Sequence, residues 1–250
     1  MASRHMEALR ELMWMACELS GYPVAVEEDP YMPLDGRMEH AAVTGRDHHL
    51  IRYNPNCGKP KEHIVAHECA HIIRLGRSEP RMMGFTEESI GKAVEDIMRD
   101  EGRLDKGTCL SMAVDLLTQL YNTPQDIRIE RWLYERFPTL RGMQSESLRR
   151  TVEEYQMILS REVERFTPRK VYRASCGMNS AFTRGVVPIL KDKRILRPYY
   201  GRVGDAIGKR LIRILEGVPD NGYEGDIEVI DMWAQELGVR DWYVWKVIGD

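Results

Sequence analysis

The chain has no histidine after His71, because all seven of its histidines fall within the first 71 of its 250 residues. Chemistry that needs an imidazole is therefore confined to the N-terminal third. The five cysteines are odd in number, widely spaced and never in a C-x-x-C pair, which excludes a disulfide framework and a thiolate zinc site as expectations. This cysteine pattern predicts a protein of the reducing cytoplasm.

The sequence also lacks any run of about 20 apolar residues and any N-terminal segment typical of a signal peptide. We therefore expect neither a membrane partner nor export. The formal net charge of −3 gives no electrostatic case for nucleic acid. A basic stretch between residues 165 and 200 contains aromatic residues, but Asp192 and Asp205 dilute its charge, so a solvated face is expected there.

Apolar periodicity and turn residues predict an α+β protein that is mainly helical, with a small N-terminal sheet. Strands are expected over 23–28, 38–44 and 48–53, with the tandem histidines His48 and His49 at a solvated strand end. Helices are expected over 7–20, 61–75, 86–102, 104–121, 124–137, 146–165, 203–216 and 224–237. We expect a core over residues 1–140 and a helical extension over 141–250 that packs on it, with one compact domain over the whole chain as the alternative.

The predicted helix over 61–75 contains the pattern His67-Glu68-x-x-His71. Two histidines four positions apart lie on one face of a helix, so both imidazoles can reach one metal ion. Glu68 is rotated by roughly 100° from His67 and can approach a water on the metal without being a ligand. Apolar residues surround the pattern, so the helix should be buried and its ionisable groups should need partners.

On this motif the chain resembles the zincin superfamily of metallopeptidases, over about residues 61–76. The resemblance implies Zn²⁺ as the cofactor, His67 and His71 as two of its ligands, and Glu68 as the general base. It further implies a small mixed sheet packed on the motif helix, with an antiparallel edge strand that binds extended peptide. We expect that strand at 48–53 or at the neighbouring 38–44.

A catalytic zinc usually has three protein ligands, so a third must be found. No later histidine exists, and three side chains on successive turns of one helix splay too far apart, so His63 is expected to orient another residue or to lie in the core. A carboxylate ligand, as in the gluzincin branch, is predicted on the segment that follows Pro124. Glu130 is the preferred ligand, and Asp126 would then support the ligands without binding the metal. In the alternative, Asp126 is the ligand and Glu130 has the supporting role.

The Thr123-x-x-Asp126 spacing resembles a helix cap, which favours a structural role for Asp126. The usual gluzincin order, however, is a ligand glutamate followed one turn later by an aspartate, and this order is inverted if Glu130 is the ligand. For the group that stabilises the oxyanion, the sequence offers four candidates of equal weight: Tyr53, His63, Tyr121 and Arg128.

These observations predict a zinc-dependent peptidase acting on peptide or protein substrates. The alternative is a metal-bearing, non-proteolytic module that binds a partner. Glu68 argues against this alternative, because a structural zinc site needs no free carboxylate beside its ligands. The sequence contains no signal for an oligomeric state.

Overall fold

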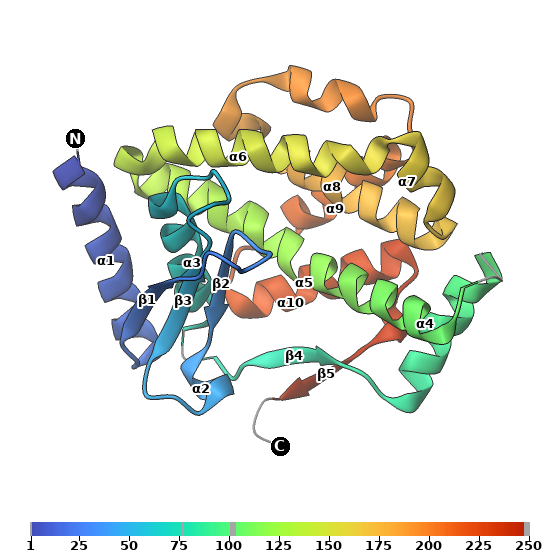
Figure 1. Ribbon diagram of the computed structural model, residues 1–250, viewed down its shortest axis with the longest axis horizontal. Helices are drawn as coiled ribbons and strands as arrows, with labels where there is room; N and C mark the ends of the chain where they lie inside the picture. The colour runs from blue at the N-terminus through green and yellow to red at the C-terminus, as the bar shows by residue number, and fades with distance from the viewer. Residues whose placement is uncertain (1, 77, 101–103, 248–250) are drawn as a thin grey trace. The chain divides into compact units, whose positions relative to one another are not determined.

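A computed structural model of the chain describes residues 2–76, 78–100 and 104–247. The described residues are mainly helical, with 71% of them in helices, and they form a three-stranded sheet and a two-stranded sheet (Figure 1). The three-stranded sheet contains both parallel and antiparallel pairs. The predicted α+β class is therefore confirmed, with a small mixed sheet near the N-terminus.

The chain forms two compact units that are interleaved along the sequence. The first unit comprises residues 1–80, 128–151 and 247–250, and the second comprises 81–127 and 152–246. This grouping differs from the division after residue 140 expected from the sequence. The difference arises because one long helix contributes its first part to the second unit and its last part to the first unit.

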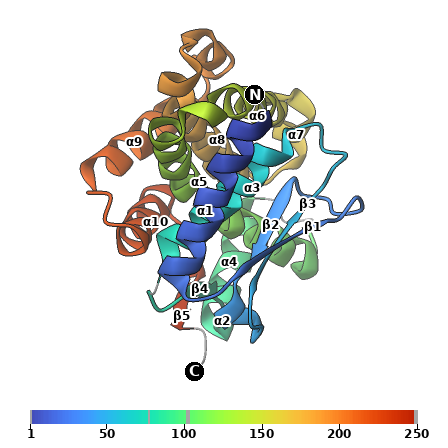
Figure 2. The ribbon, with the colours of Figure 1, turned by 90° about the vertical axis from the view of Figure 1, so that its left-hand side faces the viewer.

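The first unit holds the strands of the mixed sheet and the motif helix. Its elements are α1 (Ala2–Ser20), β1 (Val24–Glu28), β2 (Gly36–Glu39), α2 (Ala41–Thr44), β3 (His49–Tyr53), α3 (Lys61–Leu75), the end of α5 (Lys106–Arg136), η1 (Pro138–Leu140) and most of α6 (Arg141–Gln156). Helix α3 packs against α1 and against strands β2 and β3 (Figure 2). Fully buried residues such as Leu12, Ile51 and Ile72 join these elements in one apolar core.

The mixed sheet has the strand order β1-β3-β2. Strand β1 pairs with β3 in parallel and β2 pairs with β3 in antiparallel, with Met38 opposite Ile51. The expectation of an edge strand at 48–53 is therefore wrong, because β3 is the central strand and is buried on both faces. The antiparallel edge strand is β2, which is shorter than the predicted 38–44 segment since residues 41–44 turn into α2.

His48 and His49 differ in their surroundings. The side chain of His48 is exposed and pairs with Asp47, as a solvated strand end predicts. His49 is fully buried, its Nδ1 accepts a hydrogen bond from the Ala41 backbone N–H, and its ring lies edge-on to that of His40. The expectation is wrong for His49, because the start of a central strand is covered by α2 on the connection from β2.

The second unit consists largely of helices that pack on one another. Its elements are β4 (Arg81–Gly84), α4 (Glu87–Asp100), the first part of α5, η2 (Met157–Leu159), α7 (Arg161–Phe166), α8 (Arg169–Leu190), η3 (Lys193–Tyr199), α9 (Val203–Gly217), α10 (Tyr223–Leu237), η4 (Arg240–Trp242) and β5 (Val244–Val247). Helices α8 and α9 approach closely where Gly204 lies against the carbonyl of Cys176. The basic stretch between residues 165 and 200, for which the sequence predicts no helix, largely forms the 22-residue helix α8, most of which is buried.

Helix α5 runs without interruption through Pro124, so the predicted helix break at residues 122–124 is wrong. Proline has no N–H to donate and normally disrupts a helix interior. Here the neighbouring side chains bond to nearby carbonyl oxygens: Thr123 Oγ1 donates to Gln119 O at 2.6 Å, and Gln125 Nε2 donates to Tyr121 O at 2.8 Å. Thr123 is therefore not a cap, and Asp126 lies in a helix interior.

Among the described residues, no helix combines the length and apolarity needed to cross a membrane.

Candidate metal centre

Helix α3 carries three histidines on one face, at positions 63, 67 and 71. Pro60 precedes its first turn and Gly76, with φ of 53°, ends it, as the sequence predicts. The residues on its other faces are buried in the core of the first unit, and His63 is also buried. His67 and Glu68 are half-buried, so they lie at the boundary of the core, where a ligand can reach them.

The rings of His67 and His71 lie close together, with their Nε2 atoms directed toward each other. Their Nε2 atoms are 3.2 Å apart, and the ring centroids are 4.9 Å apart in an edge-to-face arrangement. Two nitrogen ligands of one tetrahedral zinc, each bound at about 2.0–2.1 Å, are separated by about 3.3 Å. The His67 and His71 nitrogens therefore have a spacing that suits a shared metal ion.

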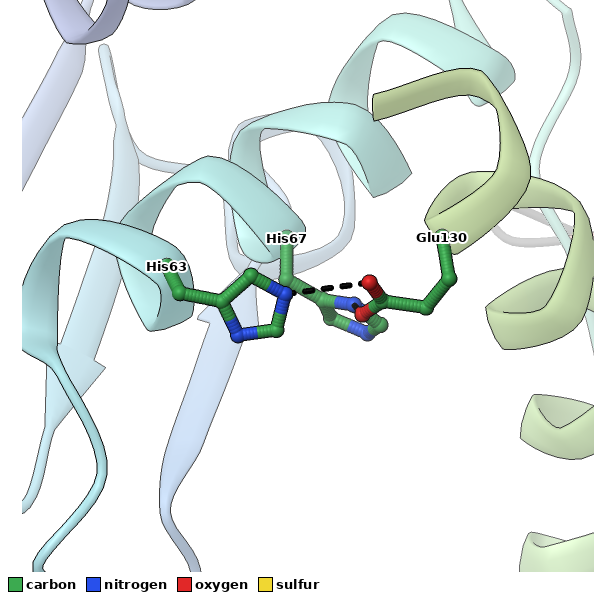
Figure 3. A group of neighbouring side chains, drawn as sticks. All are labelled: His63, His67 and Glu130. Carbon is green, nitrogen blue, oxygen red and sulfur yellow. Dashed lines mark hydrogen bonds and ion pairs between the residues drawn. The ribbon is translucent and has the colours of Figure 1, made fainter. Parts of the chain in front are cut away.

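The carboxylate of Glu130, on α5, is hydrogen-bonded to the Nδ1 atom of His67 (Figure 3). His67 Nδ1 donates to Glu130 Oε1 at 2.8 Å, and His63 Nε2 donates to Glu130 Oε2 at 3.0 Å. Glu130 is only 2% exposed, so these bonds form away from water. A proton fixed on His67 Nδ1 leaves a lone pair on its Nε2, which is the atom that faces His71.

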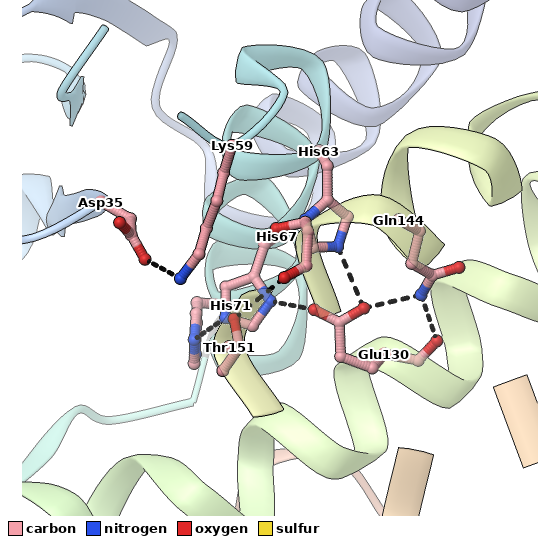
Figure 4. Close-up of polar contacts among 9 residues, drawn as sticks. Asp35, Lys59, His63, His67, His71, Glu130, Gln144 and Thr151 are labelled. Carbon is pink, nitrogen blue, oxygen red and sulfur yellow. Dashed lines mark hydrogen bonds and ion pairs between the residues drawn. The ribbon is translucent and has the colours of Figure 1, made fainter. Parts of the chain in front are cut away.

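Gln144 of α6 completes the surroundings of this carboxylate (Figure 4). Its side-chain Nε2 donates to Glu130 Oε2 at 2.6 Å and to the Glu130 backbone carbonyl at 2.7 Å. Gln144 could not be predicted from the sequence, because a lone glutamine on a polar helix gives no local signal. His63 is found where the sequence predicts it, orienting another residue of the site.

The charge of Glu130 is stabilised by its donors. Burial by itself would raise the pKa of Glu130, but the electrostatic interaction with His63 and the hydrogen bonds from His63 and His67 outweigh burial and hold this pKa far below its usual range. Glu130 is therefore a carboxylate at neutral pH. An ionised carboxylate behind a histidine fixes the ring and makes its second nitrogen a better ligand.

Asp126 lies on α5 one turn before Glu130, on the same face of the helix. It is half-buried, and as a residue of a continuous helix it has no capping role. The predicted pair of carboxylates is thus presented by one rigid helix, with Asp126 preceding Glu130.

Glu68 lies against the beginning of the edge strand β2. A Cβ atom added to Gly36 would be 3.0 Å from Glu68 Oε1 and 2.5 Å from Ile64 Cγ2. Only a glycine therefore allows the β2 backbone to come this close to α3. The closeness puts the predicted general base directly beside the strand predicted to bind peptide.

An ion pair between a buried lysine and a partly exposed aspartate lies next to this contact. Lys59, just before α3, has a side chain that is 3% exposed, and its Nζ lies 2.5 Å from Asp35 Oδ2 (Figure 4). Asp35 directly precedes Gly36, so the pair connects the start of β2 to the start of α3. The sequence analysis missed both residues because they are 24 positions apart and carry no motif.

Two of the four oxyanion candidates from the sequence are bonded to carboxylates. Tyr53 donates its hydroxyl to Glu28, and His63 donates to Glu130. Tyr121 belongs to the second unit, where its hydroxyl is 3.5 Å from that of Tyr223. Arg128 is buried on α5. The oxyanion donor stays a prediction.

The spacing of the side chains around His67 would allow a metal ion to bind. His63, His67 and Glu130 each offer a ligand atom, and these atoms lie within 4.8 Å of one another. The imidazole nitrogens of His67 and His71 add a pair at the spacing of shared ligands. Burial and the charge of Glu68 raise the pKa of Cys69 to about 12, so this buried thiol is protonated at neutral pH.

No protein-family model, curated protein or solved structure matches this chain.

Proposed function

We propose that the chain is a zinc-dependent peptidase whose metal centre is built on α3. The observation that carries the proposal is the fixed state of His67: buried Glu130 accepts from its Nδ1, and its Nε2 faces His71 Nε2 at 3.2 Å. A histidine whose second nitrogen is bonded to a carboxylate is the usual form of a zinc ligand. The unpaired state of all five cysteines supports a cytoplasmic location.

His67 and His71 would hold the ion through their Nε2 atoms, and Asp126 would supply the third ligand. Glu130 would then orient His67 from behind, because its Oε1 contacts Nδ1 and its Oε2 is held by His63 and Gln144. This assignment is the alternative of the sequence analysis. It restores the gluzincin order, in which the ligand carboxylate precedes the orienting one by a turn.

The chain's own part in catalysis falls to Glu68. Zinc, when bound, lowers the pKa of a coordinated water toward 7 and polarises a carbonyl group. Glu68 is half-buried beside β2 and accepts the proton of the attacking water, which it then gives to the leaving amine. Since His67 and His71 are neighbours of Glu68 on α3, one rigid helix positions the base and both histidines.

We further propose that peptide substrates bind in extended form along β2. Strand β2 is an edge of the mixed sheet, and an edge strand offers backbone N–H and C=O groups to an added strand. The Gly36 backbone contacts Glu68, so a peptide paired with β2 would run past the base. Substrates in this view are unfolded or extended protein segments.

The test is cleavage of a peptide library by the wild-type protein and by Glu68→Gln, with the metal content of each measured. We expect the wild type to bind zinc and to cleave, and Glu68→Gln to retain zinc and lose cleavage by about a hundredfold or more. Glu62→Gln, the same change one turn and a half earlier on α3, is the matched control and should cleave normally. Equal cleavage by Glu68→Gln and wild type would remove Glu68 from the mechanism. Zinc binding without any cleavage would favour the non-proteolytic module.

A further inference from the structure

We propose that the second unit carries a binding site for a small phosphate monoester, in a cavity between α4 and α8. The cavity has a volume of about 390 Å³, within the range of small-ligand sites. Its lining residues are Asp96, Arg99, Asp100, Arg169, Lys170 and Arg173. The proposal is independent of the metal centre, because none of these residues is a proposed metal ligand or contacts one.

The two carboxylates of the cavity are engaged in holding its wall. Asp96 is buried and accepts hydrogen bonds from Lys92 at 2.9 Å, Lys170 at 2.7 Å and the Trp242 indole at 3.1 Å. Asp100 accepts a hydrogen bond of 2.7 Å from the backbone N–H of Lys170, in the first turn of α8. Their negative charges therefore fix Lys170 and the beginning of α8.

Arg169 and Arg173, by contrast, have no carboxylate partner among the described residues. They lie one turn apart on α8, and both are exposed at the cavity. Like charges at this spacing repel each other, and a helix beginning disfavours cations. An anion bound between the two guanidinium groups would relieve both effects.

The charge of the cavity fits a dianion. Four cationic side chains and two carboxylates leave a surplus of two positive charges. A phosphate monoester carries about −1.5 to −2 at neutral pH, whereas a carboxylate carries −1. Guanidinium groups also match phosphate oxygens with two parallel hydrogen bonds, which makes paired arginines well suited to this group.

The basic charge is local and does not continue as a track along α8. Further along the chain, Arg184 pairs with Asp205, and Arg194 pairs with Asp192 at 2.9 Å. An extended polyanion such as nucleic acid would need a continuous row of unpaired cations. These acidic partners therefore favour a compact phosphate ester over a nucleic-acid strand.

The experiment is calorimetric titration of the full chain with phenyl phosphate, and with benzoate as a carboxylate of similar shape. We expect saturable binding of phenyl phosphate at least about tenfold tighter than that of benzoate. Because Lys170 Nζ lies 5.2 Å from the ring centroid of buried Trp242, tryptophan emission should change along the same binding curve.

The variant Arg169→Gln/Arg173→Gln should lose phenyl phosphate affinity by about tenfold or more, and the single change Arg173→Gln by less. Arg161→Gln on α7, an exposed arginine outside the cavity, is the matched control and should bind as the wild type does. Thermal unfolding of each variant checks that it is folded. Equal affinity of the double variant and the wild type, or no saturable binding by the wild type, would overturn the proposal.

A second set of titrations distinguishes a small phosphate ester from a phosphorylated protein as the ligand. The probes are glycerol phosphate and a phosphoserine peptide with its unphosphorylated form as the reference. Binding of both phosphorylated probes at similar strength supports a small phosphate ester as ligand. Selective binding of the peptide overturns the small-ester assignment in favour of a phosphorylated protein.

Discussion

The two ring nitrogens of His67 have different partners, and this difference supports the orienting role proposed for Glu130. Nδ1 donates to Glu130, while Nε2 faces His71. A metal ligand and the group that orients it contribute differently to affinity. Removing a ligand removes a bond to the ion, whereas removing an orienting partner costs about 10–100-fold in metal affinity.

This assignment predicts the relative effects of two substitutions on zinc binding. Asp126→Asn should weaken zinc binding more than Glu130→Gln does, and Glu130→Gln should weaken it by about 10–100-fold. Titration of the metal-free protein against a chromophoric zinc chelator measures both. Asp115→Asn, at a position earlier on α5, is the control and should be neutral. A larger loss with Glu130→Gln would exchange the two roles.

Helical spacing alone predicts that His67 and His71 share one helix face and that Asp126 and Glu130 share another, and the structure has these spacings. The roles of these residues at a metal ion stay predictions. The sequence was insufficient for Gln144 and for the Lys59–Asp35 pair, which meet their partners through tertiary packing. His63 is intermediate: geometry excluded it as a ligand, but its bond to Glu130, 67 positions away, required the fold.

At the scale of elements, the approach of β2 to α3 is the feature that joins the substrate strand to the base. It depends on Gly36, where a methyl group would meet Ile64 at 2.5 Å and Glu68 at 3.0 Å. Overpacking of this kind costs about 1–3 kcal/mol and is relieved by small shifts of the neighbours. A shift of β2 or of Glu68 would disturb catalysis more than metal binding.

We therefore predict that Gly36→Ala lowers kcat/KM for peptide cleavage by about tenfold or more while the zinc content is unchanged. The reason is that the added methyl group displaces Glu68 but touches neither His67 nor His71. Gly142→Ala on α6, where an added Cβ meets nothing within 4 Å, is the control and should retain activity. Full activity of Gly36→Ala would contradict the proposed pairing of substrate with β2.

Helix α5 explains why one element was mispredicted. Asn122-Thr123-Pro124 has the local chemistry of a helix start, and local signals alone favour a break. Burial on both sides of Pro124, at Leu120 and Ile127, favours a continuous helix, and Thr123 and Gln125 bond to backbone carbonyls around the proline. Tertiary packing thus outweighs the local preference, and the same continuity places Asp126 and Glu130 on one face.

At the scale of the whole molecule, the two units should differ in their response to acid. In the first unit, burial and the neighbouring His40 and His48 lower the pKa of His49 to about 4. An unfolded histidine takes up a proton near pH 6.5. The stability that neutral His49 contributes is therefore present above about pH 6.5 and is lost as the pH falls to about 4, by on the order of 3 kcal/mol.

Chemical denaturation monitored between pH 7 and pH 4 tests this expectation. The wild type should lose stability across this range, and His49→Asn, which keeps an acceptor for the Ala41 N–H, should show a smaller loss. His48→Asn removes only the smallest of the causes that lower the pKa of His49, so it should reduce the loss by less than His49→Asn does. An unchanged pH dependence in His49→Asn would show that another group is responsible.

The second unit should respond at lower pH. Burial opposes the charge of Asp96, but hydrogen bonds from Lys170, Lys92 and Trp242 outweigh it and hold the pKa of Asp96 at about 2. The stability from this carboxylate is present above about pH 4 and is lost as the pH falls to about 2, by on the order of 2 kcal/mol. Hydrogen exchange measured at stepwise lower pH should show the first unit opening before α4 and α8. The reverse order would contradict this account.

The most direct test of the central claim is an anomalous difference map, recorded at the zinc absorption edge, from crystals of the wild-type protein grown with zinc. The account predicts one peak on α3, bonded to the Nε2 atoms of His67 and His71 and to a carboxylate oxygen of Asp126, with Glu130 remaining on His67 Nδ1. No peak at His67 and His71, or a peak bonded to His63 and Glu130 instead, would contradict it.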